Sequence, residues 1–243
     1  GIRQSGKTTT LKRMIHEAGE LGYTVLVIDV KAKPHGIPDF ADIGKSVQIH
    51  LKQATEYGVD PLALKGLLES ASRMRINFQF YELIEACKGS HTIGDVLSKV
   101  KNALQETKLH PIRREKLGVL ELLLKTLWEE METVNYSNVL RIDEGCINVM
   151  DITKYSDAFK QMVVRSVAES VRQEFTEIIV VFDEAHVHIP QGYSSASKRP
   201  VTILVKEGGG SKQYVWAADQ TIKETEKDVL KQMGLWIVGR QME

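Results

Sequence analysis

Residues 1–10 read Gly-Ile-Arg-Gln-Ser-Gly-Lys-Thr-Thr-Thr, and the first eight fit the pattern G-x-x-x-x-G-K-[ST] at every fixed position. Glycines let a backbone curl tightly enough to aim successive N–H groups at phosphate oxygens, and a helix that begins there adds the positive end of its dipole. Apolar residues follow at helical spacing in 8–21, and Gly22 is a stop signal. The stretch therefore predicts a phosphate-binding loop that opens a helix.

The pattern of this loop predicts a role for each of its residues. We expect it to bind ATP together with Mg²⁺. Lys7 is expected to act in catalysis as a mobile cation at the β and γ phosphates, and the Thr8 hydroxyl is expected to coordinate Mg²⁺. The expected nucleotide-binding residues are Gly1, Arg3, Gln4, Ser5, Gly6, Lys7, Thr8 and Thr9.

A pair of carboxylates follows the apolar run 178–182. Such a run predicts a core strand, and ligands of open α/β sheets bind at the carboxyl ends of the strands. Asp183 is therefore the expected Mg²⁺ partner, and Glu184 is the expected general base for an attacking water. Glu184 favours hydrolysis over phosphoryl transfer to a second substrate, although a small-molecule kinase with a helical lid stays open. Asp29, at the end of another predicted strand, is either a further residue near the phosphates or a loop cap.

Two histidines, His186 and His188, follow the carboxylates. Without a third ligand in the sequence they are weak evidence for a zinc site. Residues 183–186 also spell the DEAH tetrapeptide of two-lobed helicases. Those enzymes need a second lobe, and this chain has no room for one.

Strand-like and helix-like segments alternate along most of the chain, which predicts an α/β fold with a mainly parallel sheet flanked by helices. Region 57–136 has apolar residues at helical spacing throughout and predicts an inserted all-helical subdomain, with the core formed by 1–56 and 137–243. Strands are expected at 23–30, 47–51, 146–152, 177–182, 213–218 and 235–238. Further helices are expected at 157–175, from about residue 200 to the glycines at 208–210, and at 223–233, with a loop at 183–190.

The composition is that of an ordinary globular protein, with 42% hydrophobic and 26% charged residues. Lys plus Arg and Asp plus Glu number 32 each, so any site for a polyanion must be local. The middle of the predicted insert is basic, and its cations either form a solvated surface or contact nucleic acid or another subunit. These cations are Lys99, Lys101, Lys108, Arg113, Arg114 and Lys116.

The two cysteines, Cys87 and Cys146, form no disulfide framework or metal-type spacing, which favours a reducing, cytoplasmic setting. No apolar run reaches the length of about 18 residues that a membrane span needs, so we expect no membrane contact. A phosphate-binding loop normally follows a buried strand, and the chain begins at Gly1 without Met. We therefore expect the natural N-terminus to lie upstream.

The order of motifs resembles the HerA/FtsK superfamily of hexameric DNA-pumping ATPases, which includes conjugation and viral packaging motors. The resemblance covers nearly the whole chain. Its segments are GIRQSGKTT (1–9), VLVIDVKAKPHG (25–36), GVDPLAL (58–64), INVMDIT (147–153), VVFDEAH (180–186), KEGGGSKQYVWAADQ (206–220) and WIVGRQ (236–241).

This resemblance implies a RecA-like ATPase that forms a homohexameric ring, hydrolyses ATP at the subunit interfaces and translocates or unwinds double-stranded DNA in a central pore. It also implies a possible nuclease or other protein partner. Gln220 matches the glutamine that senses the γ-phosphate, and Arg240 is the best match to the arginine that one subunit inserts into its neighbour's site. Arg199 is a weaker match.

The chain departs from the family pattern at two places. The segment before 213–218 carries lysines where relatives carry arginines, and Thr221 stands where Arg is common. An ATPase that switches a protein partner without translocation therefore remains an alternative. For the DNA-pumping interpretation, the hypothesised phosphate contacts are Lys198, Arg199, Lys206 and Lys212.

Overall fold

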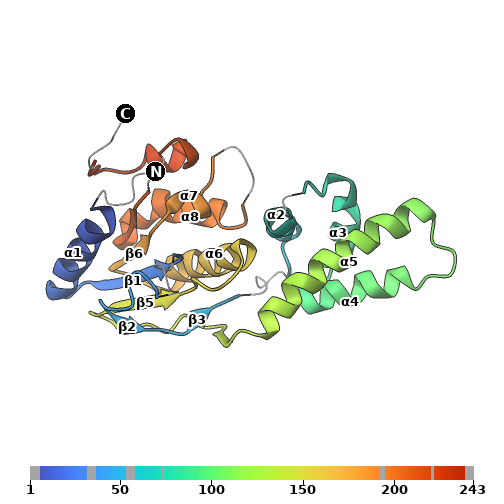
Figure 1. Cartoon of the computed structure of the whole chain (residues 1–243), viewed down its shortest axis with the longest axis horizontal. Helices are drawn as coiled ribbons and strands as arrows, with labels where there is room; N and C mark the ends of the chain where they lie inside the picture. The colour runs from blue at the N-terminus through green and yellow to red at the C-terminus, as the bar shows by residue number, and fades with distance from the viewer. Residues whose placement is uncertain are drawn as a thin grey trace.

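The computed structural model describes residues 6–31, 37–52, 58–72, 74–191, 195–219 and 222–238. Its centre is a five-stranded sheet in the order β2-β5-β1-β6-β7, in which every neighbouring pair is parallel (Figure 1). The strands are β1 (Thr24–Asp29), β2 (Lys45–Ser46), β5 (Ile147–Asp151), β6 (Ile178–Phe182) and β7 (Gln213–Ala217). The predicted α/β fold with a mainly parallel sheet is confirmed.

The middle of the sheet is formed by the most apolar strands. Five of the six residues of β1 and all five of β6 are buried, as expected of strands covered on both faces. The register places Val27 beside Val149 of β5 and Val181 of β6. Because side chains alternate between faces of a strand, this alignment divides the apolar residues into two cores.

One core lies under α1 (Lys7–Glu20), which buries Leu11, Ile15 and Ala18 against Val27 and its neighbours. The other core contains α6 (Asp157–Glu174) and α8 (Lys198–Glu207), which lie on the opposite face of the sheet from α1 (Figure 1). The fold is therefore a sheet between two helical layers.

Helix α6 is apolar around most of its circumference, with buried residues on every turn. Ser156 caps its first turn by accepting a hydrogen bond from Phe159 N at 3.2 Å. A helix that is apolar on several faces must be covered on each of them. Here α6 packs against the sheet on one side, α8 on a second and the inserted helices on a third.

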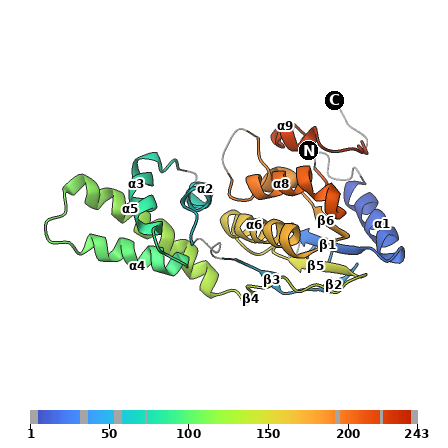
Figure 2. The same cartoon turned by 180° about the vertical axis from the view of Figure 1, so that it is seen from behind.

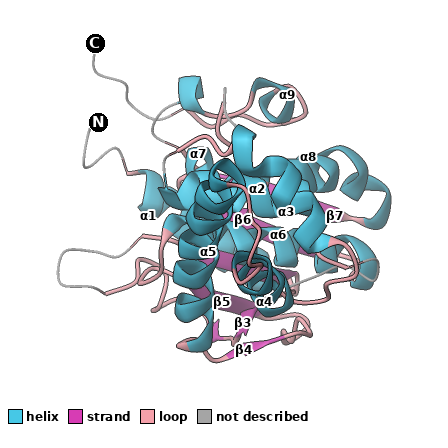
Figure 3. Cartoon of the chain, turned by 90° about the vertical axis from the view of Figure 1, so that its right-hand side faces the viewer, coloured by secondary structure: helices cyan, strands magenta, loops and turns pink. Residues whose placement is uncertain are grey.

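The inserted region lies between β3 (Ile49–His50) and β4 (Tyr136–Ser137), which pair in parallel. It projects from the side of the core opposite α1 (Figure 2), and Figure 3 shows it in front of the central strands. Its elements are α2 (Pro61–Ser72), the 3-10 helix η1 (Asn77–Gln79), α3 (Phe80–Cys87), α4 (Ile93–Leu104) and α5 (Pro111–Glu132). The described part of this region is helical, while the domain boundaries given above remain a prediction.

Helices α4 and α5 form an antiparallel hairpin whose ends are defined by the sequence. Thr92 and Asp95 form a reciprocal capping box at the start of α4, and Pro111 occupies the first turn of α5, where its missing N–H costs nothing. The apolar residues of the hairpin join the same core as α2 and α6. The inserted helices are thus packed onto the sheet and α6 through continuous apolar contact.

Several predicted elements differ from the structure. The predicted strand 47–51 is replaced by β2 and β3, because the chain leaves the main sheet between them. The predicted loop 183–190 contains the short helix α7 (Ala185–His188), and the predicted helix 223–233 is divided into the 3-10 helix η3 (Ile222–Glu224) and α9 (Lys227–Leu230). Another 3-10 helix, η2 (Gly208–Ser211), continues α8.

The predicted strand 235–238 is wrong. Its residues, Leu-Trp-Ile-Val, are irregular in the structure, with Leu235 77% and Ile237 61% exposed. An apolar β-prone sequence becomes a strand only beside a hydrogen-bonding neighbour, and none of the strands within the described ranges pairs with it. Nor does any helix in those ranges combine the length and apolar composition that crossing a membrane requires.

The packing of the insert predicts a contrast between two leucines of α5. Leu124 is fully buried, whereas Leu122 is 65% exposed. Leu124→Ala should lower the free energy of unfolding by about 2–5 kcal/mol, because it leaves a cavity in a continuous core. Leu122→Ala removes the same atoms from the surface and should stay within about 0.5 kcal/mol. Chemical denaturation of both variants checks this, and equal losses would contradict the described burial.

Candidate active site

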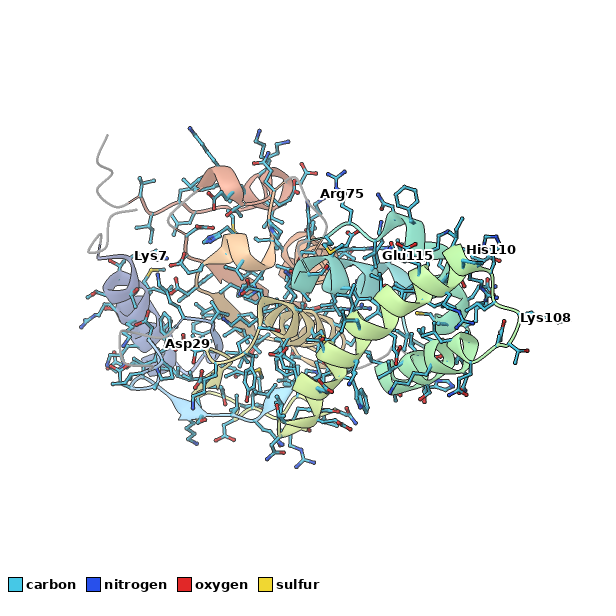
Figure 4. The ribbon with its side chains drawn as sticks, turned by 45° about the vertical axis from the view of Figure 1, so that its right-hand side comes forward. Lys7, Asp29, Arg75, Lys108, His110 and Glu115 are labelled. Carbon is cyan, nitrogen blue, oxygen red and sulfur yellow. The ribbon has the colours of Figure 1, made fainter. Side chains whose placement is uncertain are left out.

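The carboxyl ends of the central strands bring acidic residues into one row. Asp29 ends β1 directly beside Asp151, the end of β5. On the other side of β1, Ile28 is level with Phe182, so Asp183 emerges next along the same edge. Figure 4 shows Lys7 and Asp29 at this end of the molecule, far from Lys108 and His110 at the tip of the insert. This edge therefore brings Asp29 and Asp183, both of which the sequence predicts near the nucleotide, into one row with Asp151.

Gly6 makes the transition from the loop to α1. Its φ of 73° is left-handed, a conformation that a side chain disfavours, and it directly precedes the first residue of the helix, Lys7. Thr8 and Thr9 lie in the first turn of α1, where backbone N–H groups lack helical partners. The remaining predicted phosphate contacts lie outside the described residues and stay predictions. They are Gly1, Arg3, Gln4 and Ser5.

Lys7 reaches from α1 to the end of β6. Its Nζ lies 3.0 Å from Asp183 Oδ1 and 3.1 Å from Glu184 Oε1. The two carboxylates are 1% and 6% exposed, so they are buried charges held together by one ammonium group. The structure thus brings together the three residues to which the sequence assigned Mg²⁺, phosphate and proton transfer.

A second lysine contacts the same carboxylate. Lys31 Nζ lies 2.8 Å from Glu184 Oε1, on the oxygen that Lys7 also contacts. Lys31 follows β1 and is separated from Glu184 by 153 residues in the chain. The sequence analysis missed this residue. The sequence feature that could have identified Lys31 is its position two residues after Asp29, at the end of a predicted strand.

The pKa values of the two carboxyl groups are shifted in opposite directions. Burial raises the pKa of Asp183, and the charge of Lys7 offsets this only in part. Burial acts in the same direction on Glu184, but the hydrogen bond from Lys31 and the charge of Lys7 outweigh it and lower the pKa. For Lys7, burial opposes the charged form, yet the charges and hydrogen bonds of Asp183 and Glu184 raise its pKa. Glu184 is therefore ionised at neutral pH and able to accept a proton.

Asp183 fits a divalent cation. Both of its carboxylate oxygens are buried, and the contact of Oδ1 with Lys7 offsets the cost of burial only in part. Buried carboxylate oxygens are normally hydrogen-bonded or metal-bound, and oxygen is the ligand that Mg²⁺ prefers. Asp183 and the Thr8 hydroxyl are thus the residues that would hold Mg²⁺.

Asp29 is a fully buried carboxyl beside this group. Its Oδ2 accepts a hydrogen bond from Phe40 N at 2.7 Å and its Oδ1 one from Lys31 N at 3.3 Å. Burial nevertheless dominates and raises the pKa of Asp29 from 3.8 to about 6. Of the two roles left open above, the loop cap is the one that these bonds describe, and the cap sits immediately before Lys31.

The backbone turns sharply after β6. Glu184 has φ 52° and ψ 55°, a left-handed conformation that costs a residue with a side chain about 1–2 kcal/mol. Ala185 N donates to Ala218 O at 3.1 Å, and His186 N donates to Asp219 Oδ2 at 2.8 Å. The end of β7 therefore fixes the turn that carries Glu184.

His186 belongs to a cluster that the sequence did not reveal. Its Nδ1 lies 2.9 Å from Asp219 Oδ1 and 3.7 Å from Glu184 Oε2. These three side chains offer ligand atoms within 4.8 Å of one another, so the third potential metal ligand missing from the sequence is supplied by the fold. The lysines on Glu184 oppose a second cation here, and we interpret the group as a hydrogen-bonded cluster.

His188 does not join this cluster. Its imidazole is buried against Phe182, and neither ring nitrogen has a hydrogen-bond partner among the described residues. Burial lowers the pKa of His188 to about 3, so the ring is neutral. The residue therefore acts as part of the apolar core beneath α7.

The other predicted site residues differ in position. Gln220 and Arg240, like Thr221, lie outside the described residues. Of the hypothesised DNA contacts, Lys198 pairs with Glu226, and Lys212 pairs with Glu177 at the amino ends of β6 and β7, away from the nucleotide edge. Arg199 and Lys206 are exposed on α8. In the insert, Arg113 pairs with Glu82 and Glu106, while Lys101, Lys108 and Arg114 are exposed.

No protein-family model matches the chain. A protein of Methanocaldococcus jannaschii named a probable helicase is 22% identical over 268 residues, covering 98% of this chain and 51% of that protein. The chain thus spans about half the length of this relative.

Two solved structures are similar. VirB4 of Thermoanaerobacter pseudethanolicus has a TM-score of 0.62 at 14% identity, and the match covers 96% of this chain and 71% of that one. The genome packaging NTPase B204 from Sulfolobus turreted icosahedral virus 2 has a TM-score of 0.43 at 12% identity, with 96% and 68% covered. The likeness to VirB4 shows that the chain has the fold of a P-loop NTPase, a mainly parallel sheet flanked by helices.

Proposed function

We propose that this chain is the ATP-hydrolysing part of a HerA/FtsK-type motor that translocates on, or pumps, double-stranded DNA. The observation that carries the ATPase proposal is the contact of Lys7, from the phosphate-binding loop, with Asp183 and Glu184 within 3.1 Å. A phosphate-binding lysine, a buried aspartate carboxylate and an ionised glutamate are the parts that hydrolysis of a phosphoanhydride requires.

The residues divide the chemistry between them. Mg²⁺ held by Thr8 and Asp183 would supply positive charge to the phosphate oxygens during bond cleavage. Lys7 leaves the carboxylates to neutralise the β and γ phosphates, and Lys31 remains beside Glu184. Glu184 accepts the proton of the water that attacks the γ-phosphorus, and the bond to the ADP oxygen breaks to give ADP and phosphate.

The DNA and assembly parts of the proposal have their own, separate support. The fold is shared with VirB4. The relative from Methanocaldococcus jannaschii, half of whose length this chain spans, is named a probable helicase. In the proposed homohexameric ring, Gln220 senses the γ-phosphate, and Arg240 reaches the site of a neighbouring subunit. Since Lys198 and Lys212 already have acidic partners, the exposed Arg199 and Lys206 are the better contacts for DNA phosphates.

The same ion pairs also favour the second candidate, an ATPase that switches a protein partner. Two of the four hypothesised DNA contacts are neutralised by Glu177 and Glu226, and the chain has no net charge. Such an ATPase would use the identical hydrolytic site but would not respond to DNA.

Steady-state ATPase activity with and without linear duplex DNA tests these functions. We expect the wild-type chain to hydrolyse ATP and DNA to stimulate the rate. Glu184→Gln should lower kcat by about a hundredfold or more, because the amide cannot accept the proton of the attacking water. ATP binding by this variant, measured at equilibrium, should persist.

The outcomes separate the candidates. Hydrolysis that is indifferent to DNA would support the partner-switching ATPase and reject the DNA motor. Phosphorylation of a small molecule without net release of phosphate would instead identify a kinase. A wild-type rate equal to that of Glu184→Gln would reject the hydrolytic site itself.

Lys31 generates a prediction about pH. Because its hydrogen bond lowers the pKa of Glu184, Lys31→Met should raise that pKa and move the acidic limb of the kcat profile to higher pH. Below this limb Glu184 is protonated and cannot act as a base, so the variant should lose most activity on the acidic side. Rates measured from acidic to alkaline pH check the shift.

Lys12→Met is the matched control for Lys31→Met. Lys12 lies on α1 and pairs with the exposed Asp42, away from the carboxylates. Its profile should superimpose on the wild type. An acidic limb that stays in place in Lys31→Met would show that this lysine does not influence the base during turnover.

A further inference from the structure

We infer that Asp219 and His186 are positioning residues that aim Glu184 at the reacting water. The inference rests on the proposed ATP hydrolysis and assigns a role to two side chains at the end of β7 and the start of α7. It begins from the geometry of Asp219, whose side chain is only 11% exposed.

Asp219 joins three segments that are separate in the chain. Its Oδ1 lies 2.9 Å from His186 Nδ1, and its Oδ2 accepts hydrogen bonds from His186 N at 2.8 Å and from the Thr225 hydroxyl. An ionised carboxylate can only accept, so His186 Nδ1 is the donor in their contact. One carboxylate thus connects the end of β7, the first turn of α7 and the segment before α9.

These bonds act on the strained turn of Glu184. A left-handed residue with a side chain persists only where its surroundings impose that conformation. Here the next two residues are both bound to the segment that follows β7: Ala185 N donates to Ala218 O at 3.1 Å, and His186 N donates to Asp219. Removing the Asp219 carboxylate would release one of these two attachments and let the turn relax.

The side chain of Glu184 is also bounded from both sides. Lys7 and Lys31 contact its Oε1, whereas His186 Nδ1 lies 3.7 Å from its Oε2. When Lys7 moves to the phosphates, the imidazole remains on the opposite side, held by Asp219. The carboxylate is then confined to the direction in which it meets a water at the γ-phosphate, and a general base works only within hydrogen-bond reach.

The bonds of Asp219 therefore link the residues that follow β7 to the turn that carries the base. His186→Ala tests this link without altering the chain around β7, because the substitution removes the imidazole and leaves Asp219 unchanged. A role in aiming Glu184 predicts that the two alanine variants affect the same step of the reaction.

The test is a set of double-mutant cycles. Asp219→Ala and His186→Ala should each lower kcat about tenfold to a hundredfold, with the equilibrium affinity for Mg²⁺-ATP changed less than about threefold. The double variant should lose no more than the stronger single one. Neither substitution should lower the residual rate of Glu184→Gln, since both act through the carboxylate that this background lacks.

Two further variants sharpen the comparison. Asp219→Asn keeps an oxygen that can accept from His186 N but presents an NH2 donor to His186 Nδ1, so it should recover only part of kcat. Asp228→Ala is the matched control, because this exposed aspartate of α9 pairs with Lys231 and is not a member of the cluster of Glu184, His186 and Asp219. It should behave as the wild type.

A second readout does not depend on activity. The ¹³C resonance of the Glu184 side-chain carboxyl should move in Asp219→Ala and stay in place in Asp228→Ala. An unmoved resonance would overturn the inference whatever the rates. Loss of Mg²⁺-ATP binding in Asp219→Ala, or an equal loss of rate when the substitution is made in Glu184→Gln, would also overturn the inference. Absence of ATPase activity in the wild type would reject the proposed function instead.

Discussion

The structure depends on the neutralisation of two buried carboxylates at the end of one strand. Asp183 and Glu184 are adjacent in sequence and almost fully buried, and an unpaired charge in that environment costs several kcal/mol. Lys7 and Lys31 supply the compensating charges from two different segments. The position of α1 relative to β6 is therefore set by electrostatics as well as by apolar packing. Under the proposed ATP hydrolysis, Lys7 would serve two partners, the carboxylates before nucleotide binding and the phosphates afterwards.

Much of the fold could be predicted because its strands and helices carry strong local patterns. The run around Val27 is apolar on both faces, as only a central strand of a covered sheet needs to be, and residues 8–21 and 157–175 have clear helical periodicity. Lys7, Asp183 and Glu184 could be nominated because a fixed spacing and a strand end place them by chain geometry alone. Their convergence in the structure agrees with that reasoning.

Other features could not be predicted because they depend on partners distant in the chain. Lys31 meets Glu184 across 153 residues, and Asp219 meets His186 across 33. Nothing in either segment's own pattern specifies such a contact. The apolar segment around Trp236 shows the converse limit, since its composition favours a strand but composition cannot provide a neighbouring strand. Glu184 adds a third kind of exception, a side chain in a glycine-like conformation, which local propensity disfavours and only the surrounding bonds explain.

Because the core is continuous, the chain tolerates added or removed residues at some positions and not at others. Apolar residues run without interruption from the sheet through α6 into α2, α4 and α5, so removing the insert would expose the outer face of α6 to water. The insert and the rest of the chain therefore share one core and depend on each other for burial of their apolar residues. The turn 105–110 between α4 and α5 is different, because it is largely exposed and lies at the end of the molecule remote from Lys7 (Figure 4). Insertions, fused domains or attached probes are best accommodated there, where they extend the surface without disturbing either core.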